Sequence, residues 1–142
     1  MTDTYKGSCL CGAVSFEASD VDHQAAHCHC RMCRKFHGAE HATFVGVPRK
    51  SFRLIDRGDA VAEFGAPNGT VRSFCRNCGS SLFFWSPNGD PEVVEVSLAV
   101  FDDNVPVVPD AHIFVGSAAN WTLITDDLPQ FLEGRGSGKV ER

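Results

Sequence analysis

The spacing of hydrophobic and polar residues in this chain favours short strands over long helices. Apolar residues alternate with polar ones, or form brief apolar runs, in eight stretches that are separated by Pro, Asn, Gly and Asp. Such punctuation is typical of turns between strands. The predicted strands cover residues 13–18, 42–47, 51–55, 61–64, 70–75, 81–85, 93–100 and 112–115. The pattern therefore predicts a mainly β protein.

Helical spacing is confined to two short segments. One covers residues 30–37 and is ended by Gly38, and the other is a single turn over residues 128–132. No internal repeat or linker divides the chain, so we predict one domain over residues 3–133. Residues 134–142 are rich in Gly and offer little to bury, which predicts a flexible C-terminal tail.

Composition narrows the class of protein. With 142 residues, 43% hydrophobic and 22% charged, the chain has the profile of one globular domain. Its net charge of −5 disfavours a nucleic-acid partner, because phosphate binding is driven by Lys and Arg. No run of about 18 apolar residues predicts a membrane span. No secretory signal precedes the first cysteine, so we expect a reducing, cytoplasmic location.

Seven cysteines are the most informative feature of the composition, because an odd number cannot pair off within one chain. They form three groups: Cys9 and Cys11 as C-x-C, then Cys28, Cys30 and Cys33 as C-x-C-x-x-C, then Cys75 and Cys78 as C-x-x-C followed by Gly79. Reduced cysteines clustered in this way are typical of metal ligands.

Seven ligands divide naturally into four and three. A structural zinc ion takes four ligands, whereas a catalytic zinc ion takes three from the protein and leaves one position open. The two pairs would together make the closed site, and Cys28, Cys30 and Cys33 the open one. A histidine could instead close the second site, the candidates being His27, His29, His37 and His41. An iron–sulfur cluster and a disulfide exchanger using Cys30 and Cys33 are further alternatives. His29, between two ligand cysteines, is expected to be solvated or to find a local partner.

Basic residues gather near the three-cysteine group. Residues 28–57 hold seven Lys and Arg against two acidic residues, and the block begins with Arg31, Arg34 and Lys35. A solvated face is the plainer reading of these charges. The alternative is a site that attracts a small anion.

The cysteine groups and their neighbours resemble a known family. The segments that carry the resemblance are 7–14, 28–35 with Gly38 and Ala39, 74–80, 112–115, Trp121 and 126–129. They are similar to those of the glutathione-dependent formaldehyde-activating enzymes, also called the centromere protein V type domain. The resemblance implies a β-tent of bent antiparallel sheets with one or two short helices. It also implies two zinc ions per chain: structural zinc at Cys9, Cys11, Cys75 and Cys78, and an open zinc at Cys28, Cys30 and Cys33.

The resemblance also implies a reaction. The chain is expected to be a carbon–sulfur lyase that promotes addition of glutathione, or a similar small thiol, to formaldehyde or another small aldehyde. Arg31, Arg34 and Lys35 are the expected contacts for the carboxylates of the thiol, and His37 or His41 the expected source of a proton. The alternatives are a non-catalytic zinc module that carries a thiol or binds a protein, and methionine sulfoxide reduction, which needs a cysteine free of metal. The oligomeric state stays open.

Overall fold

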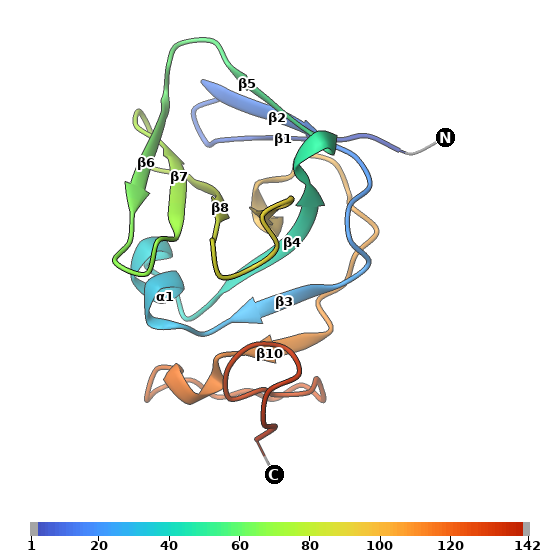
Figure 1. The fold of residues 1–142 in the computed structure, drawn as a ribbon, viewed down its shortest axis with the longest axis vertical. Coiled ribbons are helices and arrows are strands. Elements are labelled where there is room, and N and C mark those ends of the chain that lie inside the picture. The colour runs from blue at the N-terminus through green and yellow to red at the C-terminus, as the bar shows by residue number, and fades with distance from the viewer. Residues whose placement is uncertain (1–2, 141–142) are drawn as a thin grey trace. The chain divides into compact units, whose positions relative to one another are not determined.

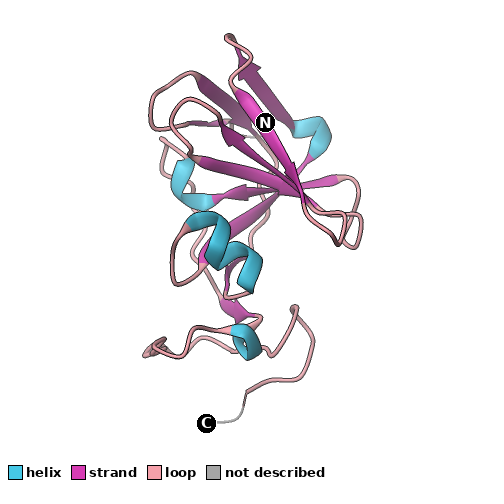
Figure 2. Cartoon of the chain, turned by 90° about the vertical axis from the view of Figure 1, so that its left-hand side faces the viewer, coloured by secondary structure: helices cyan, strands magenta, loops and turns pink. Residues whose placement is uncertain are grey.

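The computed structural model describes residues 3–140 and is mainly β, as the sequence predicts (Figure 2). Its strands are β1 Tyr5–Ser8, β2 Val14–Ala18, β3 Ala25–Cys28, β4 Ala42–Pro48, β5 Phe52–Asp56, β6 Val61–Gly65, β7 Val71–Cys75, β8 Ser81–Trp85, β9 Val93–Ser97 and β10 Ala111–Ile113. The one α-helix of this described part is α1, Arg31–His37, and 3-10 turns occupy Arg49–Ser51, Leu98–Val100 and Val115–Ser117. None of the described helices is both long and apolar enough to cross a membrane.

The chain separates into two compact units, each built from segments that are discontinuous in sequence. Within the described residues, unit 1 comprises 3–23 and 45–106, and unit 2 comprises 24–44 and 107–140. Strand β4 begins in unit 2 and ends in unit 1. Figure 1 labels this strand and colours the chain by residue number. The cysteine pairs of the predicted closed site all fall in unit 1, and the three-cysteine group falls in unit 2.

Unit 1 holds two antiparallel arrangements of strands. In the first, β2 pairs with both β1 and β5, so that Phe16 lies opposite Gly7 and Leu54. In the second, β6, β7, β8 and β9 pair in that order, with a shift of register between Ser73 and Phe74. Alternate residues of β2 are buried, which is the period of a strand with one face in a core. The bulge lies just before Cys75, and bulges commonly redirect the residues that follow.

The core of unit 1 surrounds its cysteines. One cluster contains Cys9 and Cys75 with three apolar neighbours, Val14, Ala60 and Leu82. A second cluster contains Phe16, Ala18, Val47, Val94 and Val96. Because Cys9 and Cys75 are part of a packed core, their backbone positions are set by tertiary packing as well as by their own turns.

In unit 2, β3 leads directly into α1, and β10 pairs with β3 (Figure 1). This pairing is parallel, whereas the family resemblance implied antiparallel sheets. Parallel pairing needs a long connection, and more than 80 residues separate these strands in sequence. Helix α1 ends at Gly38, as predicted. Gly38 has a left-handed φ of 58°, and the N–H of Gly38 donates to the carbonyl of Arg34.

The segment after β10 differs from the sequence prediction. The helical turn expected at residues 128–132 is absent from this described segment, where Gln130 instead forms a bridge with His112. Residues 134–140 fold back, because Phe131 bridges Lys139 and the N–H of Leu132 donates to Gly138. Backbone hydrogen bonds thus hold residues 134–140 in place, although this segment has few apolar side chains to bury. The mobility of the tail in solution stays a prediction, as does the single domain over residues 3–133.

Candidate metal-binding sites

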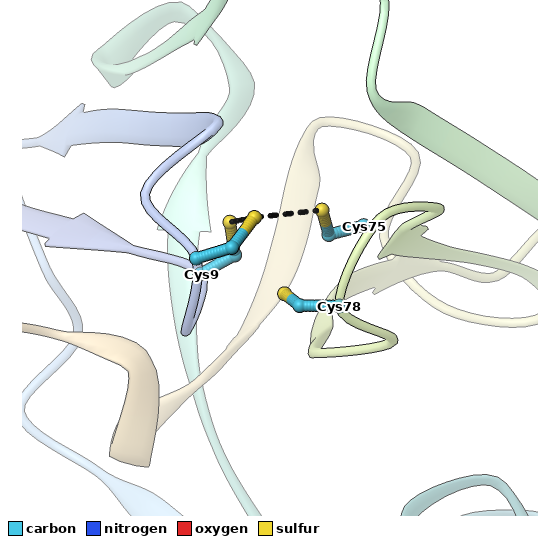
Figure 3. Close-up of side chains that lie close together, drawn as sticks. Cys9, Cys75 and Cys78 are labelled. Carbon is cyan, nitrogen blue, oxygen red and sulfur yellow. Dashed lines mark hydrogen bonds between the residues drawn. The ribbon is translucent and has the colours of Figure 1, made fainter.

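Four cysteine sulfurs meet in unit 1, as Figure 3 shows for the labelled Cys9, Cys75 and Cys78. Cys9 and Cys11 come from the loop between β1 and β2, Cys75 ends β7, and Cys78 lies in the turn before β8. The Sγ atom of Cys11 lies 3.6 Å from that of Cys9 and 3.7 Å from that of Cys75. A zinc–sulfur bond of about 2.3 Å gives a tetrahedral edge of about 3.8 Å. The donor set therefore fits one zinc ion.

The two loops that carry these cysteines are shaped by backbone hydrogen bonds. The N–H of Val14 lies 3.3 Å from Sγ of Cys9, and the N–H of Gly79 donates to the Cys75 carbonyl at 2.7 Å. Gly79 has a φ of 80°, a left-handed conformation that suits glycine. The Cys78 thiol hydrogen-bonds the Ser80 hydroxyl at 3.1 Å, and bonds to the side chain and main chain of Ser80 lower its pKa to about 5. A low pKa favours the thiolate that binds metal.

Three cysteine sulfurs meet in unit 2. Cys28 ends β3, Cys30 is the N-cap residue of α1, and Cys33 lies in its first turn. Their sulfurs lie within 4.8 Å of one another, and the N–H of Cys33 donates to Sγ of Cys30 at 3.3 Å. Hydrogen bonding with Cys30 and Cys33, and then burial, raises the pKa of the Cys28 thiol. Three thiolates so close together need a positive charge between them, which a metal ion supplies.

No histidine completes this group among the described residues, since the mutually close donor atoms are the three sulfurs alone. His37, the spacing-based candidate, packs edge-on against Phe44 with ring centres 5.5 Å apart. The alternative in which a histidine closes the second site therefore has no support from the geometry. The donor set fits a metal ion with three protein ligands.

Four histidines that the sequence does not connect gather in unit 2. The rings of His41 and His112 contact each other and the rings of both His27 and His29, with centre separations of 4.6 to 6.3 Å. His27 also hydrogen-bonds the hydroxyl of Thr43 at 2.7 Å. Burial, followed by the neighbouring His41 and His112, lowers the pKa of both His27 and His29 to about 4. Both rings are therefore neutral at pH 7.

The expectation that His29 is solvated or finds a local partner is wrong. His29 is 0% exposed, and its Nε2 lies 2.8 Å from Nδ1 of His112, 83 residues away in sequence. Nε2 of His112 in turn lies 2.9 Å from a carboxylate oxygen of Asp126. Only the parallel pairing of β10 with β3 brings these residues together, so no local pattern could have revealed the contact. His112, a polar residue next to the apolar residues 113–115, was a local sign of a buried polar contact, but it did not indicate the partner.

The three basic residues of α1 differ in their surroundings. Arg31 and Lys35 are exposed, whereas Arg34 is half-buried and its Nη1 donates to the Ser117 carbonyl at 2.9 Å. Arg34 thus links the helix to the turn that follows β10. Arg31 and Lys35 are the two members of the predicted substrate-binding set that lie at the surface.

Comparison with known proteins gives three findings. A family model described as "Glutathione-dependent formaldehyde-activating enzyme" matches residues 4–117. A Schizosaccharomyces pombe protein named as an uncharacterized lyase is 27% identical over 128 residues, covering 84% of this chain and 91% of its own. The crystal structure of a Rhodobacter sphaeroides protein superposes with a TM-score of 0.57 and 24% identity, covering 71% of this chain and 91% of that one. This last likeness shows a shared fold.

Proposed function

Because this chain belongs to the glutathione-dependent formaldehyde-activating enzyme family, we propose that it promotes addition of glutathione, or a similar small thiol, to formaldehyde or another small aldehyde. The family and the relative named as a lyase support a lyase of this general kind. In the proposed reaction the thiol sulfur bonds to the carbonyl carbon, the C=O π bond breaks, and the thiol proton ends on the carbonyl oxygen. The reverse direction is carbon–sulfur cleavage, the lyase reaction.

The observation that carries this proposal is the three-sulfur group in unit 2, which no histidine joins among the described residues. We assign zinc to it, and a second zinc to Cys9, Cys11, Cys75 and Cys78. When bound by three cysteines, zinc supplies a Lewis acid that lowers the pKa of a thiol placed beside it. Cys28, Cys30 and Cys33 then act in catalysis by holding that ion.

Charge supports an anionic thiol. Arg31 and Lys35 are exposed on the same short helix that carries Cys33, so we assign them to the carboxylates of the thiol. Arg34 donates to Ser117 and is assigned to holding the helix in place. His37, half-buried at the end of α1, is proposed to pass the proton to the carbonyl oxygen. We also propose that the protein acts in the cytoplasm, where glutathione is kept reduced.

The reaction is tested by NMR exchange between formaldehyde and glutathione, with and without the metal-loaded protein. We expect acceleration by the wild type, about two zinc ions per chain by metal analysis, and no acceleration by Cys33→Ser. Retention of full acceleration in Cys33→Ser would contradict the proposed role of the three-cysteine group. Absence of both acceleration and glutathione binding in the wild type would favour a non-catalytic zinc module.

Binding of the thiol has its own test. Arg31→Gln combined with Lys35→Gln should raise the Kd for glutathione roughly fivefold, because each exposed ion pair contributes about 0.5 kcal/mol. Arg53→Gln is the control, since Arg53 has an exposed guanidinium in unit 1 that pairs with Glu17. Equal Kd values for the double variant and the control would remove the two residues from the binding site. Isothermal titration calorimetry provides the measurement.

A further inference from the structure

Three side chains of unit 2 form a continuous hydrogen-bonded series, which we call the Asp126–His112–His29 chain. A carboxylate oxygen of Asp126 lies 2.9 Å from Nε2 of His112, and Nδ1 of His112 lies 2.8 Å from Nε2 of His29. His29 is 0% and His112 4% exposed, so breaking either bond would leave a polar atom without water. The side chain of Asp126 is 46% exposed and connects this buried series to the surface.

The inner end of the series lies between two members of the three-cysteine group, since His29 separates Cys28 from Cys30. Strand β10 holds this residue twice. His112 contacts its ring, and the carbonyl of Ile113 accepts a hydrogen bond from its main-chain N–H at 2.9 Å. A rotation of the backbone at His29 would displace the cysteines on both sides. Because β10 holds both the ring and the main chain of His29, it restricts the backbone on which the two neighbouring cysteines are carried.

The carboxylate gives the series a direction. An ionised carboxylate only accepts hydrogen bonds, so Nε2 of His112 is the donor to Asp126. In a neutral His112 ring, Nδ1 then accepts, and Nε2 of His29 donates to it. In this tautomer Nδ1 of His29 carries no proton, and it has no hydrogen-bond partner among residues 3–140. Asp126 thus selects the tautomer and ring orientation of His29 through His112.

We propose that the Asp126–His112–His29 chain is a positioning device for the three-cysteine group. It holds the Cys28–Cys30 segment in the conformation that directs both sulfurs to one point, and so sets how tightly the group retains a metal ion. His112 and Asp126 act through His29, so both are positioning residues. The inference rests on the part of the proposed function that places a metal ion at Cys28, Cys30 and Cys33, and not on the aldehyde reaction.

Loss of metal from the two sites distinguishes positioning from general stability. The protein is loaded with Co²⁺ and challenged with EDTA, and the sulfur-to-cobalt absorption is followed with time. Cys33→Ser identifies the kinetic phase that belongs to the three-cysteine group. Asp126→Asn and His112→Phe should release Co²⁺ in that phase about 10-fold faster or more, because replacing the partners that orient metal ligands weakens binding by about 10-fold to 100-fold. The phase of the four-cysteine site in unit 1 should not change.

Two further variants sharpen the result. His112→Asn keeps an acceptor near the position of Nδ1, so it should release Co²⁺ more slowly than His112→Phe. Asp110→Asn is the matched control. Its carboxylate is 43% exposed and pairs with Arg135 at 2.7 Å in the same unit. This variant should release metal at the wild-type rate.

Two outcomes would overturn the inference. In one, Asp126→Asn and His112→Phe release Co²⁺ as slowly as Asp110→Asn. In the other, both kinetic phases accelerate together, which is the result of a general loss of stability. The rates of both Co²⁺ release phases are measured without glutathione or aldehyde. The inference can therefore hold even if the proposed reaction is not found. Likewise, the reaction can be found even if Asp126→Asn and His112→Phe leave Co²⁺ release unchanged.

Discussion

The histidines of unit 2 show how burial controls the protonation of a single residue. The His27 ring contacts two other imidazoles, those of His41 and His112, and is partly shielded from water. Burial and the nearby His41 and His112 lower its pKa to about 4, from about 6.5 for an ordinary histidine. Protonation of this ring is thus less favourable in the folded chain than in the unfolded one.

His27 therefore predicts a pH dependence of stability. Between about pH 6.5 and 4 the unfolded chain binds more protons at His27 than the folded chain does, so stability falls as the pH falls. The contribution of this residue is at most about 1.4 kcal/mol per pH unit. Urea unfolding at pH 7 and pH 5.5 should show a smaller loss for His27→Phe than for the wild type. Equal losses would contradict the lowered pKa, and comparing the two chains cancels protonation of the cysteines.

At the scale of elements, the pairing of β1 with β2 depends on a residue without a side chain. Gly7 lies opposite Phe16, a fully buried member of the second core cluster. A Cβ atom at Gly7 would overlap the Phe16 ring and lie 2.6 Å from the carbonyl oxygen of Val100. The strand can approach its neighbour only because this position is glycine.

We expect Gly7→Ala to destabilise the protein by about 1–3 kcal/mol, because overpacking forces a buried ring or the backbone to move. Gly65→Ala is the control: Gly65 also lies in a strand, and a Cβ there meets no atom within 4 Å. The free energy of unfolding from urea titration checks both variants. A loss for Gly7→Ala no larger than that for Gly65→Ala would show that the strand adjusts freely.

Two strands lacked the pattern that identified the others. β1 contains Lys, Gly and Ser, and its position is set by pairing with β2 and not by its own apolar residues. β3 contains only four residues and is defined by its parallel partner β10. The longer predicted strand at residues 93–100 ends at Ser97 and continues as a 3-10 turn. A strand that is held mainly by pairing with a distant segment need not show the alternation of apolar and polar residues by which strands are predicted.

At the scale of the whole molecule, the chain passes between two units three times, and each unit contains one of the two candidate metal sites. The three cysteines of unit 2 come from one short segment, residues 28–33, whereas the four cysteines of unit 1 come from two segments. The four-cysteine site joins loops that are more than 60 residues apart in sequence. Metal binding is therefore expected to stabilise each unit separately.

Removing one ligand from each site tests this expectation. Cys75→Ser should lower the zinc content from about two to about one per chain and reduce amide protection mainly in residues 3–23 and 45–106. Cys33→Ser should do the same mainly in residues 24–44 and 107–140. Hydrogen exchange followed by mass spectrometry gives the protection of each segment. Unchanged protection of unit 1 in Cys75→Ser, with one zinc lost, would show that the metal is not needed for its fold.

Much of this protein could be predicted from its sequence, because the relevant signals are local. Strand alternation, the glycine that ends α1, and the spacing within each cysteine group all depend on neighbouring residues. The resemblance carried by those groups led to the correct family. Substrate, metal identity and the role of His37 stay predictions.

Tertiary structure alone decided which distant residues meet. The parallel pairing of β10 with β3 places His112 against His29. On its other side, His112 forms a bridge with Gln130. Arg34 likewise finds the carbonyl of Ser117 and not a local partner. Contacts over 83 residues depend on the free energy of the whole packed unit, which no window of sequence contains. Local spacing thus identified the two cysteine clusters that could hold a metal ion, and packing determined which distant residues lie beside them.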